Sequence, residues 1–303
     1  MNMPSSFANA GTRRLALGTV QFGVPYGIAN TQGQVPLAMA RDMVEFAKAR
    51  GVDTLDTAIG YGESEQALGQ VGVRDFKVVS KLLPVPADLS EPRQWVMREI
   101  EASLARLKID RLHGLLMHRS LDLTTEHGQA IFDAMCELRQ AGKVGKIGVS
   151  IYSPTELDVL ADRFEFDLVQ APFNLVDRRL EGSGWLKRLK EQGCEVHIRS
   201  AFLQGLLLMP RTDIPTKFQP WNALWDGWHA WLAQYGEDAV HVCLAYPLSL
   251  PEIDRVIVGA LDLTQLQQIA TAAGRAAKQP FPDLTCDEEN LINPAKWPGL
   301  QAP

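Results

Sequence analysis

Short apolar runs typical of buried β-strands alternate along the chain with longer segments whose apolar residues recur at helical spacing. Helical patterns cover residues 36–50, 63–70, 91–107, 126–140 and 184–192, begin again near residues 154 and 263, and fill much of the stretch before the last strand. Regular alternation of strand and helix indicates parallel strands joined by helical crossovers. The predicted strands are residues 14–20, 53–56, 76–80, 114–117, 145–150, 168–170, 195–200 and 255–258.

Eight alternations without an inserted second core predict an α/β fold, a single-domain (β/α)₈ or TIM barrel. An open, doubly wound sheet shares the alternation and is the alternative. We expect residues 1–12 to form a flexible tail, residues 13–280 the barrel, and residues 281–303 a C-terminal tail that packs on the barrel, anchored by Trp297. The Pro-rich segment 210–220 is expected to be a loop on the rim.

Composition narrows the class of protein. Of the 303 residues, 46% are hydrophobic and 22% charged, enough apolar surface for a sizeable core. The net charge of -6, with no cluster of Lys or Arg, argues against a nucleic-acid partner. No apolar segment predicts a signal peptide or a membrane-spanning helix. We therefore expect a cytoplasmic protein with no membrane partner, as a monomer or weak homo-oligomer. The cysteines, expected to be reduced thiols and not metal ligands, are Cys136, Cys194, Cys243 and Cys286.

Polar side chains stand where the second, third and fourth predicted strands end. These are Asp56, Lys81 and His118, and Tyr61 follows five residues after Asp56. In a parallel barrel, catalytic groups lie at the carboxyl ends of the strands. An ammonium at the barrel mouth needs a counter-ion, which Asp56 can supply. We expect the charge of Lys81 to lower the pKa of the Tyr61 phenol, making it an acid near neutral pH. His118 is expected to donate to a carbonyl oxygen.

Taken singly, each of these four residues has an ordinary structural interpretation, as an ion pair, a packing tyrosine or a core histidine. Their occurrence at successive strand ends favours function. The motifs DTAIGYGESE, VVSKL and LLMHR resemble those of the aldo/keto reductase family, and the resemblance covers roughly residues 13–272. It implies a (β/α)₈ barrel and hydride transfer from a nicotinamide to a carbonyl carbon, or the reverse. It also implies a catalytic tetrad of Asp56, Tyr61, Lys81 and His118.

The resemblance continues along the later strand ends and implies a nicotinamide site. The sequence GVSI places Ser150 at a nicotinamide contact, with Ile151 in place of the family's Asn, and Gln170 matches the glutamine of QxxYN. The segment RSAFLQGLLL is similar to YSPLxxGLL, whose backbone amides face the pyrophosphate. The cofactor contacts implied there are Ser200, Phe202, Gln204, Gly205 and Leu206.

Arg199 departs from the family pattern, which has an aromatic ring stacked on the nicotinamide at this position. A guanidinium can lie flat on a ring but repels the charge of an oxidised nicotinamide. Three interpretations stay open. Arg199 favours the reduced cofactor, turns towards an anionic substrate, or pairs with a nearby acid.

The stretch VIVGALDLTQLQQ aligns with the family's GxxxxxQL element, which implies contacts from Gly259, Asp262, Gln265 and Gln268. NADP-dependent members carry a basic residue two positions after that glycine, where this chain has Leu261 followed by Asp262. A carboxylate repels a 2′-phosphate but accepts hydrogen bonds from free ribose hydroxyls. NAD(H) is therefore favoured over NADP(H), unless Arg211 or Lys217 reaches the phosphate from a loop.

The expected partner is a small-molecule carbonyl substrate, contacted by Tyr26, Asn174 and Trp221. The other tryptophans of the same stretch, Trp225, Trp228 and Trp231, have helical spacing and suggest core packing. The opening LGTVQFGVPYGIAN resembles a branch found among bacterial carbohydrate and surface-polysaccharide enzymes, which favours a sugar-like or polar aldehyde.

Two other classes of function stay open. The chain can be a non-catalytic nicotinamide-binding subunit that senses redox state. It can also be a barrel isomerase that forms a Schiff base on Lys81, which requires an amine free of a tight counter-ion.

Overall fold

Eight parallel strands close into a single barrel in the computed structural model, which describes residues 10–28 and 30–297. Each strand pairs with the next along the chain, and the eighth pairs with the first. This is the (β/α)₈, or TIM, barrel that the alternation predicted, and the open sheet is excluded. The strands are β1 (Leu15–Gly18), β2 (Thr54–Asp56), β3 (Lys77–Leu82), β4 (Leu112–Met117), β5 (Val144–Ser150), β6 (Leu168–Pro172), β7 (Glu195–Arg199) and β8 (Arg255–Val258).

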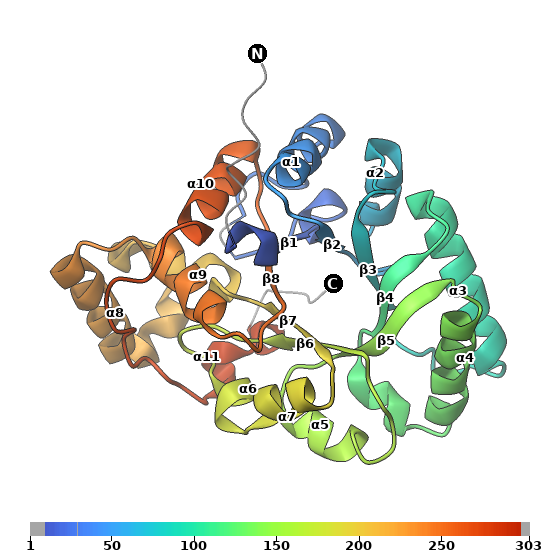
Figure 1. Cartoon of the computed structure of the whole chain (residues 1–303). Coiled ribbons are helices and arrows are strands. Elements are labelled where there is room, and N and C mark those ends of the chain that lie inside the picture. Colours follow the sequence, from blue (N-terminus) through green and yellow to red (C-terminus); the bar gives the residue numbers. More distant parts are fainter. Residues whose placement is uncertain (1–9, 29, 298–303) are drawn as a thin grey trace.

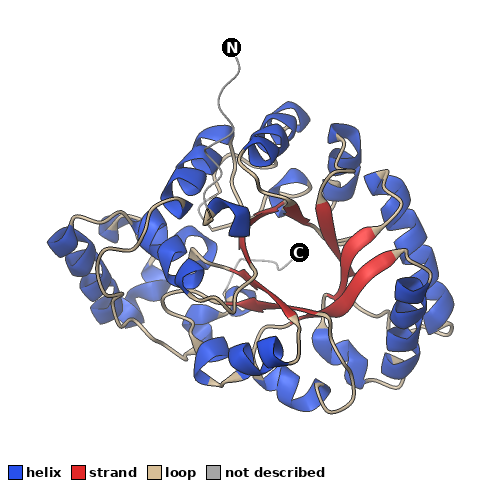
Figure 2. Cartoon of the chain, in the orientation of Figure 1, coloured by secondary structure: helices blue, strands red, loops and turns tan. Residues whose placement is uncertain are grey.

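Helices surround the strands as an outer ring (Figures 1 and 2). The order along the chain is α1 (Leu37–Ala49), α2 (Ser64–Val71), α3 (Pro92–Leu107), α4 (Gly128–Gln140), α5 (Thr155–Leu160), α6 (Arg179–Gly182), α7 (Trp185–Glu191), α8 (Asn222–Tyr235), α9 (Ala239–Ser249), α10 (Leu263–Ala273) and α11 (Glu289–Ile292). The long stretch before β8 holds two helices, α8 and α9, and α8 lies at the periphery (Figure 1). Among the described residues, no helix is both long and apolar enough to cross a membrane.

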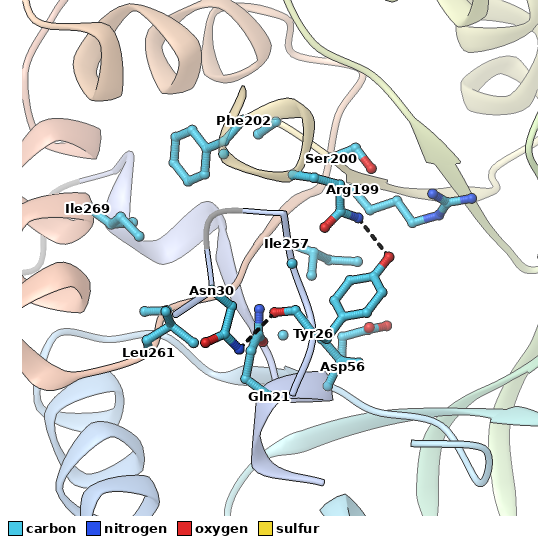
Figure 3. Close-up of a pocket in the computed structure, with 18 of the residues that line it drawn as sticks. Gln21, Tyr26, Asn30, Asp56, Arg199, Ser200, Phe202, Ile257, Leu261 and Ile269 are labelled. Carbon is cyan, nitrogen blue, oxygen red and sulfur yellow. Dashed lines mark hydrogen bonds between the residues drawn. The ribbon is translucent and has the colours of Figure 1, made fainter. Parts of the chain in front are cut away.

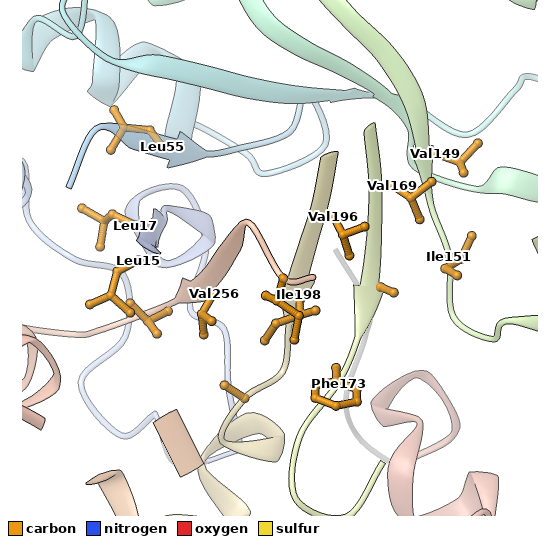
Figure 4. Close-up of a cluster of buried hydrophobic side chains, with 14 of the residues drawn as sticks. Leu15, Leu17, Leu55, Val149, Ile151, Val169, Phe173, Val196, Ile198 and Val256 are labelled. Carbon is orange, nitrogen blue, oxygen red and sulfur yellow. The ribbon is translucent and has the colours of Figure 1, made fainter. Parts of the chain in front are cut away.

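The main hydrophobic core lies between the barrel and the helices. Alternate residues of a strand point to opposite faces, so Leu15 and Leu17 of β1 and Val149 of β5 face outward into this core (Figure 4). Inside the barrel, Val79, Leu116 and Leu168 form a separate buried cluster. Two residues after each member of this cluster, at or just past the end of its strand, the same alternation directs a polar side chain inward at the carboxyl end of the barrel. These side chains are Lys81, His118 and Gln170.

The main difference from the predicted elements concerns the third strand. It was expected to end at residue 80, but β3 runs to Leu82, so Lys81 lies inside the strand. The segment 210–220 was expected to be a loop on the rim, and the structure forms two 3₁₀ turns there, Arg211–Asp213 and Thr216–Trp221.

Beyond residue 280 the chain packs against the segments that follow β6 and β7. The Trp297 side chain is buried, its indole Nε1 donates to the Leu291 carbonyl, and its ring meets Phe218 edge-on. The domain boundaries stay a prediction, since residues 1–9 and 298–303, parts of both expected tails, lie outside the described residues.

Candidate active site

A cavity of about 600 Å³ opens at the carboxyl ends of the strands. Its wall combines the loop after β1, the ends of β2, β4, β5 and β6, the loop after β7, and the start of α10 (Figure 3). Residues far apart in the sequence therefore face one space. Three of the four expected catalytic residues line it directly, namely Asp56, Tyr61 and His118.

The fourth, Lys81, lies beneath the cavity as part of a buried ion pair. Its side chain is 1% exposed and that of Asp56 is 6% exposed. Lys81 Nζ donates to the two carboxylate oxygens of Asp56 at 2.9 and 2.8 Å and to the Thr57 carbonyl at 2.8 Å. Gln170 Nε2 donates to Asp56 Oδ1 at 2.6 Å. All three ammonium hydrogens are thus used. Burial lowers the pKa of Lys81, and the charge of Asp56 opposes that shift.

Tyr61 and His118 sit over this ion pair. Lys81 Nζ lies 4.9 Å from the centre of the Tyr61 ring, and the Tyr61 and His118 rings meet edge to face with centroids 5.7 Å apart. Burial, followed by the carboxylate of Asp56, raises the pKa of Tyr61 above its usual value, and Arg199 only partly opposes this. Burial, with Lys81 and Arg199, lowers the pKa of His118 to about 3.

These shifts correct the expectation that the pKa of Tyr61 lies below its usual value. The ammonium faces the phenol ring and directs its hydrogens to Asp56 and Thr57, so desolvation of the phenol dominates. At neutral pH the phenol is protonated and the imidazole is uncharged. Both groups can therefore donate a hydrogen bond or proton to a carbonyl oxygen in the cavity.

Two glycines allow the loop that carries Tyr61 to cross the loop after β1. A Cβ on Gly23 would lie 1.7 Å from the Tyr61 carbonyl oxygen, which is far inside contact distance. Gly62 has a φ of 54°, in the left-handed region that favours glycine. Ser64 then joins the two loops, because its hydroxyl donates to the Thr19 carbonyl at 2.8 Å. The paired FG and YG dipeptides are the sequence signal for this crossing, which the sequence analysis missed.

Most of the residues expected to contact cofactor or substrate line the cavity: Tyr26, Ser150, Gln170, Arg199, Ser200, Phe202, Gln204, Gly205, Gly259, Gln265 and Gln268. Within this wall, Gln204 Nε2 donates to the Tyr26 hydroxyl at 2.7 Å. This hydrogen bond joins the loop after β1 to the loop after β7. Gln204 and Gly205 both have positive φ, at 58° and 90°, which marks the sharp turn there.

Four of the residues expected to contact cofactor or substrate do not line the cavity. Asn174 uses its amide to hold its own loop, accepting from two backbone N–H groups and donating to the Ser200 carbonyl. Asp262 caps α10 by accepting from the Gln265 N–H at 2.8 Å. Leu206 is buried in the hydrophobic core. Trp221 packs at the periphery against Phe218. Trp225 and Trp228 are buried core residues, as their spacing suggested.

The cavity also has lining residues that sequence reasoning missed, including Gln21, Asn30, Tyr152, Leu261 and Ile269. Gln21 follows the first strand, and its side-chain oxygen is buried without a hydrogen-bond partner among the described residues. Its only sequence signal was a polar residue just past a strand end. Asn30 shapes the loop after β1 through bonds to Tyr26 and Gly33.

Arg199 ends β7 with its guanidinium held by the cavity wall. It donates to the Ile151 carbonyl at 2.9 Å and lies 4.6 Å from the centre of the Tyr152 ring. No carboxylate among the described residues forms an ion pair with it, whereas many other arginines are paired. The interpretation that Arg199 is neutralised by a nearby acid is therefore wrong.

Comparison with known proteins places these features in context. The sequence profile of the aldo/keto reductase family matches residues 14–279. The chain is 24% identical to the aldo-keto reductase YhdN of Bacillus subtilis, over 99% of this chain and 97% of that protein. It is 27% identical to a 6-dehydroglucose reductase of Novosphingobium aromaticivorans, over 52% of this chain and 55% of that protein.

A solved structure is similar in fold. The holo form of aldo-keto reductase AKR11C1 from Bacillus halodurans superposes with a TM-score of 0.71 at 20% identity, covering 88% of both chains. At this identity the likeness concerns the barrel itself.

Proposed function

The chain belongs to the aldo/keto reductase family and is an oxidoreductase of that type, and we propose that it reduces the carbonyl group of a small aldehyde or sugar-like substrate with a nicotinamide cofactor. The observation that carries the proposal is the joint placement of Tyr61, His118 and the buried Lys81–Asp56 pair at one end of a cavity. Taken singly, each of these residues could have a purely structural role. Together they supply a protonated donor, a neutral second donor and a fixed positive charge at one point.

The cavity wall fits a dinucleotide. The Gln21 oxygen is a buried acceptor that lacks a donor within the described chain, and an unmet buried acceptor is costly unless a ligand satisfies it. The absence of a side chain at Gly259 makes room for the Gln21 amide, because a Cβ at position 259 would lie 2.8 Å from Gln21 Nε2. Ser150 and Gln170 are suited to a carboxamide, and the turn at Gln204 to a pyrophosphate. Gln265 and Gln268 are suited to the adenosine.

The charges of the wall favour NAD(H) over NADP(H). Among the described lining residues, Arg199 is the only Lys or Arg, and a 2′-phosphate needs a cation. Arg211, considered for that role, pairs with Asp226 at 2.6 Å instead. Lys217 lies over the rings of Phe218 and Trp297. The end of the cavity formed by α10 offers uncharged amides and apolar side chains.

A reduced nicotinamide held at Ser150 and Gln170 would supply a hydride to the carbonyl carbon. Tyr61 then gives its hydroxyl proton to the carbonyl oxygen and becomes a phenolate. Lys81, held by Asp56 under the phenol ring, stabilises that developing negative charge. His118, neutral because its pKa is depressed to about 3, directs the carbonyl oxygen by donating a hydrogen bond.

The geometry of Lys81 disfavours Schiff-base chemistry, because all three of its hydrogens are bonded and its counter-ion lies at 2.8 Å. A non-catalytic, redox-sensing subunit is the remaining alternative.

We place the protein in the cytoplasm, since the four cysteines are free thiols, as expected in a reducing compartment.

The test is a screen of aldehydes and sugars with NADH and NADPH, followed by the loss of reduced-nicotinamide absorbance. We expect turnover of several aldehydes, faster with NADH. Binding of NADH without turnover of any carbonyl compound would favour the redox-sensing subunit. A clear preference for NADPH would contradict the reading of the cavity charges.

A further inference from the structure

We infer that the substrate carries an anionic group, a carboxylate or a phosphate, which Arg199 binds beside the reacting carbonyl. The inference rests on the proposed function, because it assigns a chemical class to the substrate of the same cavity. It concerns the half of the cavity next to Tyr61 and His118 and not the half formed by α10.

The first argument is position. Arg199 is the last residue of β7, at the end of the barrel where the tetrad lies, and it pairs in register with Pro172 of β6. Figure 3 shows its side chain extending away from Leu261 and Ile269, which line the opposite side of the cavity. The positive charge of Arg199 acts on both Tyr61 and His118. It opposes the rise in the pKa of Tyr61 and contributes to the fall in the pKa of His118. The guanidinium therefore acts at the reacting groups.

The second argument is charge balance. A guanidinium stays protonated at any pH at which the protein is folded. Arg199 is half-buried in the cavity wall, and charges partly removed from water are normally paired. Asp56, the acid that lines the cavity, is already paired with Lys81. Within the described chain, Arg199 has no carboxylate partner, so an anionic ligand would complete its pairing.

The third argument is the number of donors left to a ligand. A guanidinium has five N–H groups in a planar fork that matches the oxygens of a carboxylate or phosphate. Within the described residues, one of these N–H groups is engaged, donating from Nη2 to the Ile151 carbonyl. The Tyr152 ring, 4.6 Å away, covers a face of the guanidinium and leaves its edges open. The side chain is thus held in place while most of its donors stay available.

Stacking on the nicotinamide is the competing role for Arg199. One face of the guanidinium already has an aromatic neighbour in Tyr152, and the uncompensated charge would oppose an oxidised ring. An anion bound at the edge uses the donors that the protein leaves free. The anion interpretation therefore accounts for both the fixed orientation and the missing partner.

The test compares substrates that share one carbonyl and differ in charge elsewhere. Glucuronate and glucose 6-phosphate each place an anion at the terminal carbon, where glucose has a hydroxyl, and 4-oxobutanoate is matched by its methyl ester. The variants are Arg199→Met, which removes the charge, and Arg199→Lys, which keeps it without the fork. Arg211→Met is the matched control, because it removes an arginine of the rim that is paired with Asp226 outside the cavity wall.

For Arg199→Met, kcat/KM should fall about 10- to 100-fold more for an anionic substrate than for its neutral match, the range of a charged hydrogen bond. Arg199→Lys should recover part of the loss, and Arg211→Met should keep the wild-type ratio. Relative rates of glucuronate and glucose 6-phosphate identify which anion the site takes. Equal losses for charged and neutral substrates, with a raised KM for NADH, would overturn the inference and assign Arg199 to the cofactor.

A binding measurement keeps the inference separate from the proposed activity. Calorimetric titration compares gluconate with sorbitol, neither of which has a carbonyl to reduce, on wild type and Arg199→Met in the presence of NADH. Gluconate should bind wild type more tightly than sorbitol, and the difference should disappear in the variant, whether or not any aldehyde is turned over. Equal gluconate affinity in both proteins would refute the inference even if the enzyme is active.

Discussion

Replacing Lys81 by Met tests the energetics of the buried ion pair beneath the cavity. The variant removes three hydrogen bonds of 2.8 to 2.9 Å and leaves the Asp56 carboxylate, 6% exposed, with Gln170 as its remaining side-chain donor. Breaking one partner of a buried pair costs about 3–5 kcal/mol. Since folded domains are stable by about 5–15 kcal/mol, this is a large share of the total.

Neutralising the carboxylate as well should restore much of that loss. In Asp56→Asn/Lys81→Met no buried charge remains, and the main defect is the unsatisfied Thr57 carbonyl, which costs about 1–3 kcal/mol. The double variant should therefore be more stable than Lys81→Met alone. Lys77→Met is the control on the same strand, because Lys77 pairs with Asp53 at 2.8 Å while both side chains are more than 40% exposed. That change should cost less than about 1 kcal/mol.

The assay is urea denaturation of the four proteins at several pH values. In Lys81→Met the unpaired, buried Asp56 should have a pKa above its usual range, so the folded state binds more protons than the unfolded state. Its deficit against wild type should therefore shrink as the pH falls from about 8 to about 5. A deficit for Lys81→Met no larger than that for Lys77→Met, or a double variant less stable than the single one, would refute this account of the ion pair.

Three further predictions concern other parts of the fold. Gly23→Ala places a Cβ 1.7 Å from the Tyr61 carbonyl oxygen, so it should displace the loop that carries Tyr61 and lower kcat about a hundredfold. Gly60→Ala is the control, because its Cβ meets only ordinary contacts, and it should keep the wild-type rate. Asp262→Ala removes a helix cap and should cost about 1 kcal/mol in urea; its NADH affinity by fluorescence titration should not change, and a fall would return Asp262 to the cofactor site. Glu195→Gln should cost about 2–3 kcal/mol at pH 7, because hydrogen bonds from two histidines and Lys146 outweigh burial and depress the pKa of Glu195. This contribution is fully present above the unfolded pKa of about 4.3 and declines as the pH falls from there towards the depressed pKa of the folded state, so a difference from wild type that does not shrink between about pH 5 and about pH 3 would count against this account.

The barrel was predictable because its signals are local and repeated. Each strand is a short apolar run followed by a helical segment, and eight such units leave little choice of topology. The end of β3 was misplaced because a lysine looks like a strand terminus. In the structure Asp56, on the neighbouring strand, neutralises the ammonium, so β3 continues through Lys81 to Leu82. The decisive contact joins residues 25 positions apart, which no local pattern reveals.

The site was predictable where it depends on strand ends and not where it depends on loops. Lys81 and Gln170 lie on the inward face of β3 and β6, and His118 directly follows β4. Asn174 and Trp221 lie in irregular segments, where internal hydrogen bonding and packing direct the side chains away from the cavity. The pKa of Tyr61 was misjudged for a similar reason, since it depends on burial and on where the ammonium hydrogens of Lys81 point.

The direct test of the central claim, that the Tyr61 hydroxyl protonates the carbonyl oxygen, is single-turnover reduction by Tyr61→Phe saturated with NADH. The variant keeps the ring that packs against Lys81 and His118, so the affinity for NADH should be unchanged. The rate of the chemical step should fall about 10²- to 10⁴-fold, the usual contribution of a general acid. A Tyr61→Phe enzyme that reduces the same aldehyde at the wild-type rate would contradict the account.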